Sequence, residues 1–126
     1  MGPEVILDQE ACLELLNSAT FGRVALNVRA LPRVVPVRLH VHRGQIHVSA
    51  EGALDLGDAR DGAVVALQAD GYDDRTEQMW NVHVVGRVTD PHDRGFVVSP
   101  GIVEGEWSAL PLTMGRLGAP GGRAGR

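Results

Sequence analysis

The stretch VRLHVHRGQIHVS, residues 37–49, decides the fold of this chain. Apolar and polar residues alternate on both sides of Arg43-Gly44, which is the pattern of two half-buried β-strands. A two-residue loop that contains glycine is typical of a β-hairpin. We therefore predict a hairpin whose strands run over about residues 33–42 and 45–50.

The position of the turn sets which residues face each other across the hairpin. The predicted pairs are His42 with Gln45, His40 with His47, and Arg38 with Ser49. Because side chains two apart on a strand share a face, these six residues form one polar face. The other face is apolar and consists of Val37, Leu39, Val41, Ile46 and Val48.

The polar face gathers His40, His42 and His47. Two histidines on one strand and one opposite lie within ligand reach of a common point, so they are a candidate metal or haem site. The alternative is a solvated or interface face on which the histidines are incidental. A register shift by one residue would separate the three side chains.

The same periodicity extends outward from the hairpin. A helix is predicted over residues 4–19 with Asp8 as its N-cap, and a polar loop over residues 70–78. Further strands are predicted over about residues 21–28, 63–69 and 79–89, with a turn at Arg29–Pro32 and a weak helix over 52–60. Residues 96–98 and 106–110 could each form a strand, interrupted by prolines and glycines. Many short strands with tight turns and little helix predict a mainly β fold, a small barrel.

The 126 residues fit a single domain, which we place at residues 1–114, followed by a Gly- and Arg-rich tail at 115–126 that should add little to the core.

No apolar run approaches the roughly 20 residues that span a bilayer, so no membrane association is expected. The chain opens without a signal-peptide pattern, and a lone cysteine, Cys12, suits the reducing cytoplasm. A formal charge of −4 gives no electrostatic case for nucleic acid as a partner.

Common catalytic motifs are missing: the chain has no phosphate loop, no GxGxxG after a strand and no HExxH. Trp80 is one candidate binding residue, because an aromatic face can stack on a planar ligand. The alternative is a core tryptophan at the start of a strand. Cys12 is interpreted as a packing residue of the helix.

Four segments in a fixed order carry a family resemblance. They are FGRVA at 21–25, PRVVPV at 32–37, RDGAVVAL at 60–67 and WNVHVVGR at 80–87. Together they resemble the pyridoxamine 5′-phosphate oxidase-like family of split β-barrels, most of all its small actinobacterial members, over about residues 8–90. The resemblance implies a split barrel of about six antiparallel strands with one or two short helices. It also implies a homodimer with FMN or a deazaflavin in a cleft at the dimer interface, or, as in some members, a tetrapyrrole such as haem.

The resemblance further implies a cofactor cleft that is lined by residues from several strands. The implied residues are Val35, Pro36, Val37, Arg38, Val48, Ser49, Ala50, Trp80 and Asn81. Flavin-binding relatives end their third strand in Arg-Thr and follow it with Ser/Thr-Lys, groups that hold the FMN phosphate. This chain has Ser49-Ala50 and Leu54-Asp55 there, so the usual phosphate-binding residues are missing.

Arg38, predicted opposite Ser49, offers a replacement for the missing arginine. Neighbouring positions on one face of a ladder are about 5 Å apart, a gap that an arginine side chain spans. The alternative is a surface arginine that pairs with an acid such as Glu51.

Three functional hypotheses follow from these residues. The first is a flavin- or deazaflavin-binding oxidoreductase, in which the cofactor carries the chemistry and no catalytic side chain is needed. The second is a non-catalytic split barrel whose cleft holds another planar ligand, such as a tetrapyrrole, or none. The third, a metal or haem binder, rests on the histidines of the hairpin alone. The sequence identifies neither the substrate nor the electron donor.

Overall fold

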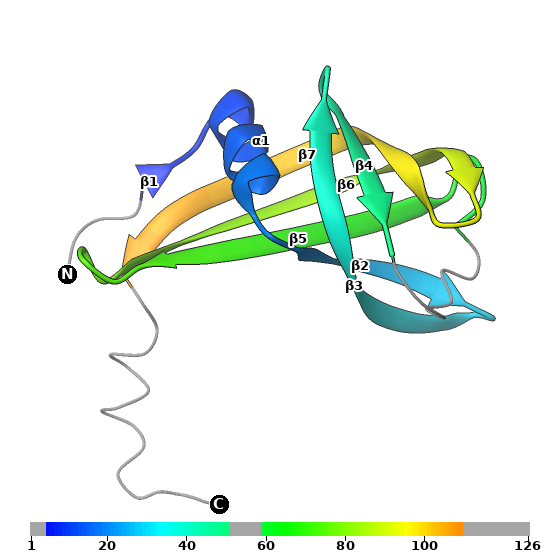
Figure 1. Ribbon diagram of the computed structural model, residues 1–126, viewed down its shortest axis with the longest axis horizontal. Coiled ribbons are helices and arrows are strands. Elements are labelled where there is room, and N and C mark those ends of the chain that lie inside the picture. Colours follow the sequence, from blue (N-terminus) through cyan, green and yellow to red (C-terminus); the bar gives the residue numbers. More distant parts are fainter. Residues whose placement is uncertain (1–4, 51–58, 110–126) are drawn as a thin grey trace, which may run out of the picture.

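The structure, a computed structural model, describes residues 5–50 and 59–109 (Figure 1). Its elements in chain order are β1 (Val5–Ile6), α1 (Gln9–Ser18), β2 (Gly22–Val28), β3 (Leu31–His42), β4 (Gln45–Ser49), β5 (Val64–Asp73), β6 (Gln78–His92) and β7 (Gly95–Ala109). The strands are antiparallel and lie in the order β1-β7-β4-β3-β2-β5-β6. A further pairing between β6 and β7 closes six of them into a ring.

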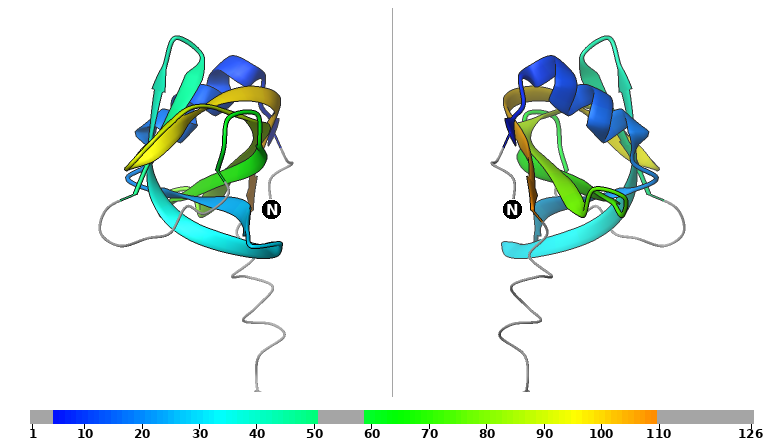
Figure 2. Two further views of the ribbon diagram at one scale, coloured as in Figure 1. Left: turned by 90° about the vertical axis from the view of Figure 1, so that its right-hand side faces the viewer. Right: turned by 90° about the vertical axis from the view of Figure 1, so that its left-hand side faces the viewer.

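The ring confirms the predicted mainly β split barrel, and the end views show its strands curving around a common interior (Figure 2). Strict alternation builds that interior: along β2, every second residue from Gly22 to Val28 is buried. Because strand side chains alternate between two faces, this pattern gives each strand one apolar inner face. Phe96, Leu16, Ile46 and Leu67 are the largest fully buried side chains.

Helix α1 lies against β3 and β7 and begins later than predicted (Figure 1). Asp8 is its N-cap, as predicted: the carboxylate accepts a hydrogen bond of 2.8 Å from the Ala11 N–H. The prediction of helix from residue 4 was wrong because Val5 and Ile6 pair with β7 as the short strand β1. Cys12 is fully buried on the inner side of the helix, which confirms its packing role.

The hairpin that decides the fold has the predicted register. Arg43 and Gly44 form its two-residue turn with φ of 53° and 75°, and the ladder pairs Arg38 with Ser49, His40 with His47 and His42 with Gln45. The turn predicted at Arg29–Pro32 is shorter, with only Arg29 and Ala30 at positive φ. Pro32 lies in the part of β3 that pairs with β2 alone, and a strand tolerates proline where one edge is open.

The structure corrects the bounds of two predicted segments in the second half of the barrel. The loop predicted over 70–78 is shorter and consists of a turn at 74–77, because β5 continues to Asp73 and β6 starts at Gln78. The two fragments predicted at 96–98 and 106–110 belong to one strand, β7. A register shift lets β7 pass through Pro100: Val85 pairs with Ile102 while Gly86 pairs with Pro100. This bulge takes up the extra residue and keeps the ladder intact on both sides.

Some predictions fall on residues outside the described ranges. These are Leu54, Asp55, most of the weak helix at 52–60, the domain boundary near 114 and the tail at 115–126. Within the described ranges α1 is the single helix, and it is too short to cross a membrane.

Candidate functional site

A pocket of about 280 Å³ opens where β2 begins beside the middle of β3 and the end of β4. Its lining residues are Thr20, Phe21, Pro36, Val37, Arg38, Ser49 and Ala50. The ladder explains this grouping, because Gly22 pairs with Val37 and Arg38 pairs with Ser49. The N–H of Ala50 donates a 2.9 Å hydrogen bond to the carbonyl of Arg94, which fixes the end of β4 beside the chain that enters β7.

Five of the nine residues predicted for a cofactor cleft line this pocket: Pro36, Val37, Arg38, Ser49 and Ala50. Val35 and Val48 neighbour them along the chain but are buried in the barrel core. Trp80 and Asn81 lie on β6 and are not among the lining residues. The structure therefore brings the hairpin part of the predicted set together and leaves the β6 part elsewhere.

Trp80 lies inside the barrel, with 7% of its surface exposed. Its indole covers Gly71, the residue paired with it on β5, so that even a methyl group at position 71 would meet the indole nitrogen. Trp107 is its partner on β7. This placement matches the core alternative for Trp80, and a role in cofactor stacking stays a prediction.

Asn81 belongs to a polar network on the outside of the barrel. Its amide oxygen accepts a 2.9 Å hydrogen bond from Gln68, which also donates to Asp70 at 3.0 Å. The Arg23 guanidinium donates to the Gln68 amide oxygen at 3.3 Å. The network thus extends from β6 across β5 to β2, and Arg23 brings it to the pocket rim.

The sequence did not single out Thr20 and Phe21 as site residues. Phe21 is 51% exposed, and the Arg23 guanidinium lies 5.7 Å from its ring centroid. Such a stacked cation keeps an exposed ring oriented at the rim. The one signal available was that Phe21 opens the first family-like segment, and its exposure could not be read from periodicity.

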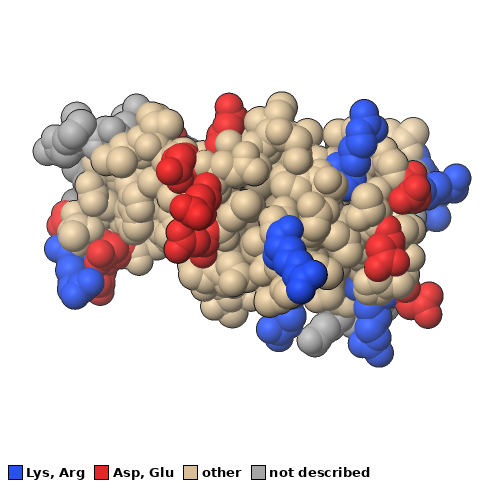
Figure 3. Space-filling model, turned by 90° about the horizontal axis from the view of Figure 1, so that it is seen from above, with Lys and Arg blue, Asp and Glu red and all other residues tan. Residues whose placement is uncertain are grey.

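Among the described residues that line the pocket, Arg38 is the charged one, and a guanidinium is a group that can bind an anion. Elsewhere the charges are mixed. On the face seen in Figure 3, arginines are separated from one another and interspersed with acidic side chains, without a continuous basic surface.

An apolar row crosses the outside of five neighbouring strands next to the pocket. Its members pair in sequence across the ladders, and they are Val34, Ala25, Ala66, Val85 and Ile102. Val34 is 66% exposed and Ile102 is 53% exposed. Val34 is two residues from Pro36 on the same face of β3, so this outer apolar row runs directly past the pocket.

The three histidines of the hairpin meet on its outer face. The ring centroids of His40, His42 and His47 are 6.1–6.3 Å apart in all three pairs. In their present orientations, no group of three His, Cys, Asp or Glu side chains in residues 5–50 and 59–109 has the geometry of a metal site.

Two described groups, Cys12 and Asp73, have a shifted pKa. Burial raises the pKa of the Cys12 thiol, with a smaller contribution from the nearby Asp8 carboxylate. The backbone N–H of Arg75, 3.0 Å from the Asp73 carboxylate, lowers the pKa of Asp73. Neither residue is among those that line the pocket.

Comparison with known proteins gives a family and a fold. The family model described as pyridoxamine 5′-phosphate oxidase matches residues 8–110. The FAD-binding protein from Mycobacterium smegmatis has a similar structure, with a TM-score of 0.70 and 25% identity over 84% of this chain and 99% of that one. An FAD-binding protein from Mesorhizobium loti shares the fold at a TM-score of 0.71 and 16% identity, over 86% of this chain and 98% of that one. No protein with a curated description matches the chain.

Proposed function

Because this chain belongs to the pyridoxamine 5′-phosphate oxidase family, we propose that it binds a flavin in the pocket between β2, β3 and β4 and acts as a flavin-dependent oxidoreductase. The observation that carries the proposal is the position of Arg38 directly opposite Ser49, with both residues in the pocket lining. FMN, FAD and phosphorylated deazaflavins share a planar ring system and an anionic phosphate. The FAD-binding proteins of the same fold support a flavin of this class.

The phosphate end of the ligand belongs at Arg38 and Ser49. A guanidinium donates charge-assisted hydrogen bonds to phosphate oxygens, and a serine hydroxyl can donate one more. Arg38 would then supply from β3 the cation that flavin-binding relatives supply from the position of Ser49 on the neighbouring strand.

The apolar lining suits the ring end of a flavin. Phe21, Pro36 and Val37 offer carbon surface beside the polar pair, and such surface excludes water from a bound ring. A bound flavin would supply the hydride or electron transfer itself, so the chain would need to contribute only position and a dry environment.

We propose that the active form is a homodimer. A pocket of about 280 Å³ is slightly smaller than the roughly 300–1,000 Å³ of small-molecule sites, so one chain would bury only part of a flavin. The outer apolar row beside it needs a cover, since an exposed contiguous apolar surface is typical of a protein interface. A second copy placed on Val34 and Ile102 would both cover this row and overhang the pocket.

A second candidate function is a non-catalytic split barrel that holds a tetrapyrrole or no cofactor. One observation favours it: Ser49, Ala50 and Asp55 stand where flavin-binding relatives have arginine, threonine and lysine. In either case the single cysteine, buried as a free thiol, is compatible with the cytoplasmic location that we propose.

The decisive experiment is a binding titration of purified protein. FMN, FAD, riboflavin and haem are added separately, and flavin fluorescence or the Soret band is followed. Saturable binding of a phosphorylated flavin, tighter than that of riboflavin, supports the first function. Haem binding without flavin binding supports the second, and binding of neither ligand contradicts the flavin proposal.

A further inference from the structure

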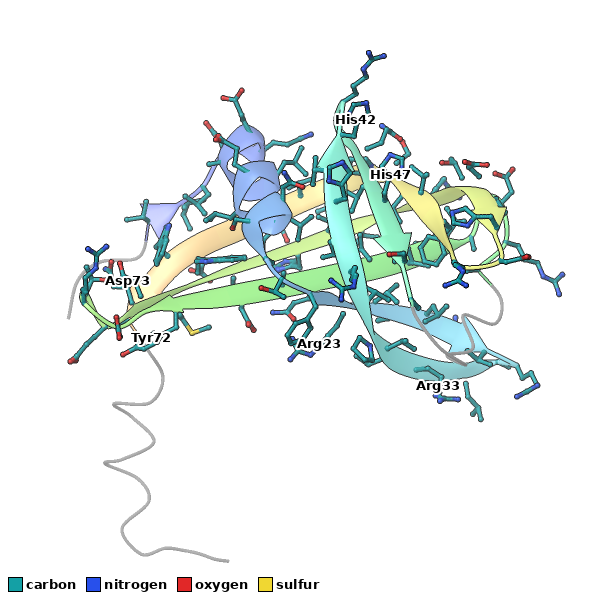
Figure 4. The ribbon with its side chains drawn as sticks, viewed as in Figure 1. Arg23, Arg33, His42, His47, Tyr72 and Asp73 are labelled. Carbon is teal, nitrogen blue, oxygen red and sulfur yellow. The ribbon has the colours of Figure 1, made fainter. Side chains whose placement is uncertain are left out.

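We propose that His40, His42 and His47 form a binding site for a borderline divalent transition metal, of which Zn²⁺ is the type, separate from the flavin pocket. These three residues are three of the five histidines in the chain. They come from two strands of one hairpin, where the ladder fixes their relative positions. Figure 4 places His42 and His47 together near the hairpin tip, far from Tyr72 and Asp73 at the other end of the molecule.

The backbone already holds the three imidazoles in a compact triangle. His40 and His47 are directly opposite each other on β3 and β4, and His42 follows His40 on the same face. Directly opposite Cβ atoms are about 5 Å apart, and residues two apart on a strand are about 7 Å apart. The tight turn at Arg43 and Gly44 joins the two strands, so this spacing needs no distant element to maintain it.

The rings need a small rearrangement to share one metal. With a metal–nitrogen distance of about 2.0–2.1 Å and tetrahedral angles, the centroids of three ligand rings would be about 5 Å apart. The observed separations of 6.1–6.3 Å exceed this by about 1 Å, which explains why the present orientations form no metal site. All three side chains are exposed, so rotation about their side-chain bonds can bring the rings together without disturbing the core.

The donor set determines which metals fit. Three neutral imidazoles suit Zn²⁺, Cu²⁺ and Ni²⁺, whereas Mg²⁺ and Ca²⁺ prefer oxygen ligands. The predicted polar face carries no carboxylate, because its other members are Arg38, Gln45 and Ser49. Three protein ligands leave a fourth tetrahedral position to water or substrate, as in catalytic rather than structural zinc sites.

The site is distinct from the proposed dimer surface. His40 lies six residues beyond Val34 along β3, a distance of roughly 20 Å at the spacing of a strand. The inference therefore does not depend on flavin binding or on the dimer. A metal titration without flavin tests it alone.

The experiment uses the full chain without an affinity tag, stripped of metal with a chelator. Zn²⁺ is titrated calorimetrically, and Co²⁺ is added in a parallel sample to record the visible absorption that reports tetrahedral coordination. We expect one Zn²⁺ per chain with a dissociation constant on the order of micromolar or tighter. The variants His42→Gln and His47→Gln should each weaken binding by about tenfold or more and abolish the Co²⁺ spectrum.

His92→Gln is the matched control, because His92 is an exposed histidine at the end of β6 outside the cluster. It should bind Zn²⁺ as the parent protein does. Circular dichroism verifies that each variant is folded. Three results would overturn the proposal: no stoichiometric binding in the parent, equal loss in His92→Gln, or a loss in His42→Gln without one in His47→Gln, which would mean that the two strands do not share the metal.

Discussion

Arg38 on β3 stands directly opposite Ser49 on β4, and both residues line the same pocket. A guanidinium and a hydroxyl are thereby presented side by side at the end of a short hairpin. The ladder fixes which two residues meet, while the long arginine side chain retains the reach to adjust to a ligand.

The first prediction is that the substitution Arg38→Ala weakens the binding of phosphorylated flavins but not that of riboflavin. Loss of a charge-assisted contact should raise the FMN dissociation constant about tenfold or more, and riboflavin, which has no phosphate, should bind as before. Fluorescence titration of both ligands measures the difference. Arg33→Ala, on the same strand outside the pocket lining, serves as control. Equal weakening of both flavins would show that Arg38 does not contact a phosphate.

The second prediction concerns assembly through the outer apolar row. Val34→Asp and Ile102→Asp each place a charge in the proposed interface, where burial of an unpaired carboxylate is costly, and should shift a dimer toward monomer. Sedimentation velocity at several concentrations measures the shift. Leu31→Asp is the control, since Leu31 is 65% exposed but pairs with Val28 on the other face of the sheet. A parent protein that is monomeric at tens of micromolar would refute the dimer.

The third prediction concerns the reactivity of Cys12. Burial raises the pKa of the thiol, so the reactive thiolate is scarce at neutral pH. The native protein should therefore react with a thiol reagent such as dithionitrobenzoate only after unfolding. The unfolded chain should then release one equivalent of thionitrobenzoate, because it contains one cysteine. Rapid labelling under native conditions would indicate that α1 opens readily from the barrel.

The fourth prediction concerns Gly95, the first residue of β7. A Cβ atom there would overlap the carbonyl oxygen of Val48, which is a backbone atom and cannot move aside cheaply. Gly95→Ala should therefore destabilise the fold by about 1–3 kcal/mol, in the range of overpacking substitutions. Gly101→Ala is the control, because its nearest neighbour would be the Val85 carbonyl oxygen at 3.3 Å. Urea denaturation compares the two variants, and equal midpoints would contradict the steric account.

The sequence was sufficient to predict the β3–β4 hairpin, because the register of this hairpin depends on a local signal. Arg43-Gly44 selects a two-residue turn, and the alternation on either side then determines each cross-strand pair. The same reasoning could not find Phe21 in the pocket. Its place in the pocket lining follows from the pairing of β2 with β3 and from its exposure next to a strand end, neither of which periodicity encodes.

The sequence did not predict that β7 is one continuous strand, for a related reason. Pro100 and Gly101 are ordinary signs of a strand break, and only the partner strand reveals that a bulge accommodates them. The polar residues of 70–78 suggested a longer loop than the structure contains. They are polar because the β5–β6 hairpin projects beyond the core, and hydrogen bonding to the partner strand is enough to keep that segment extended.

Strand β7 pairs with β1, β4 and β6, although it is the last strand in the described chain. During synthesis the ribosome must therefore release residues as far as about Ala109 before the ring can close. Until then β4 and β6 each have an unpaired edge, and such edges can recruit a strand from another chain. Nascent chains of this protein should consequently require protection from one another late in translation, at the moment when most of the barrel has already emerged.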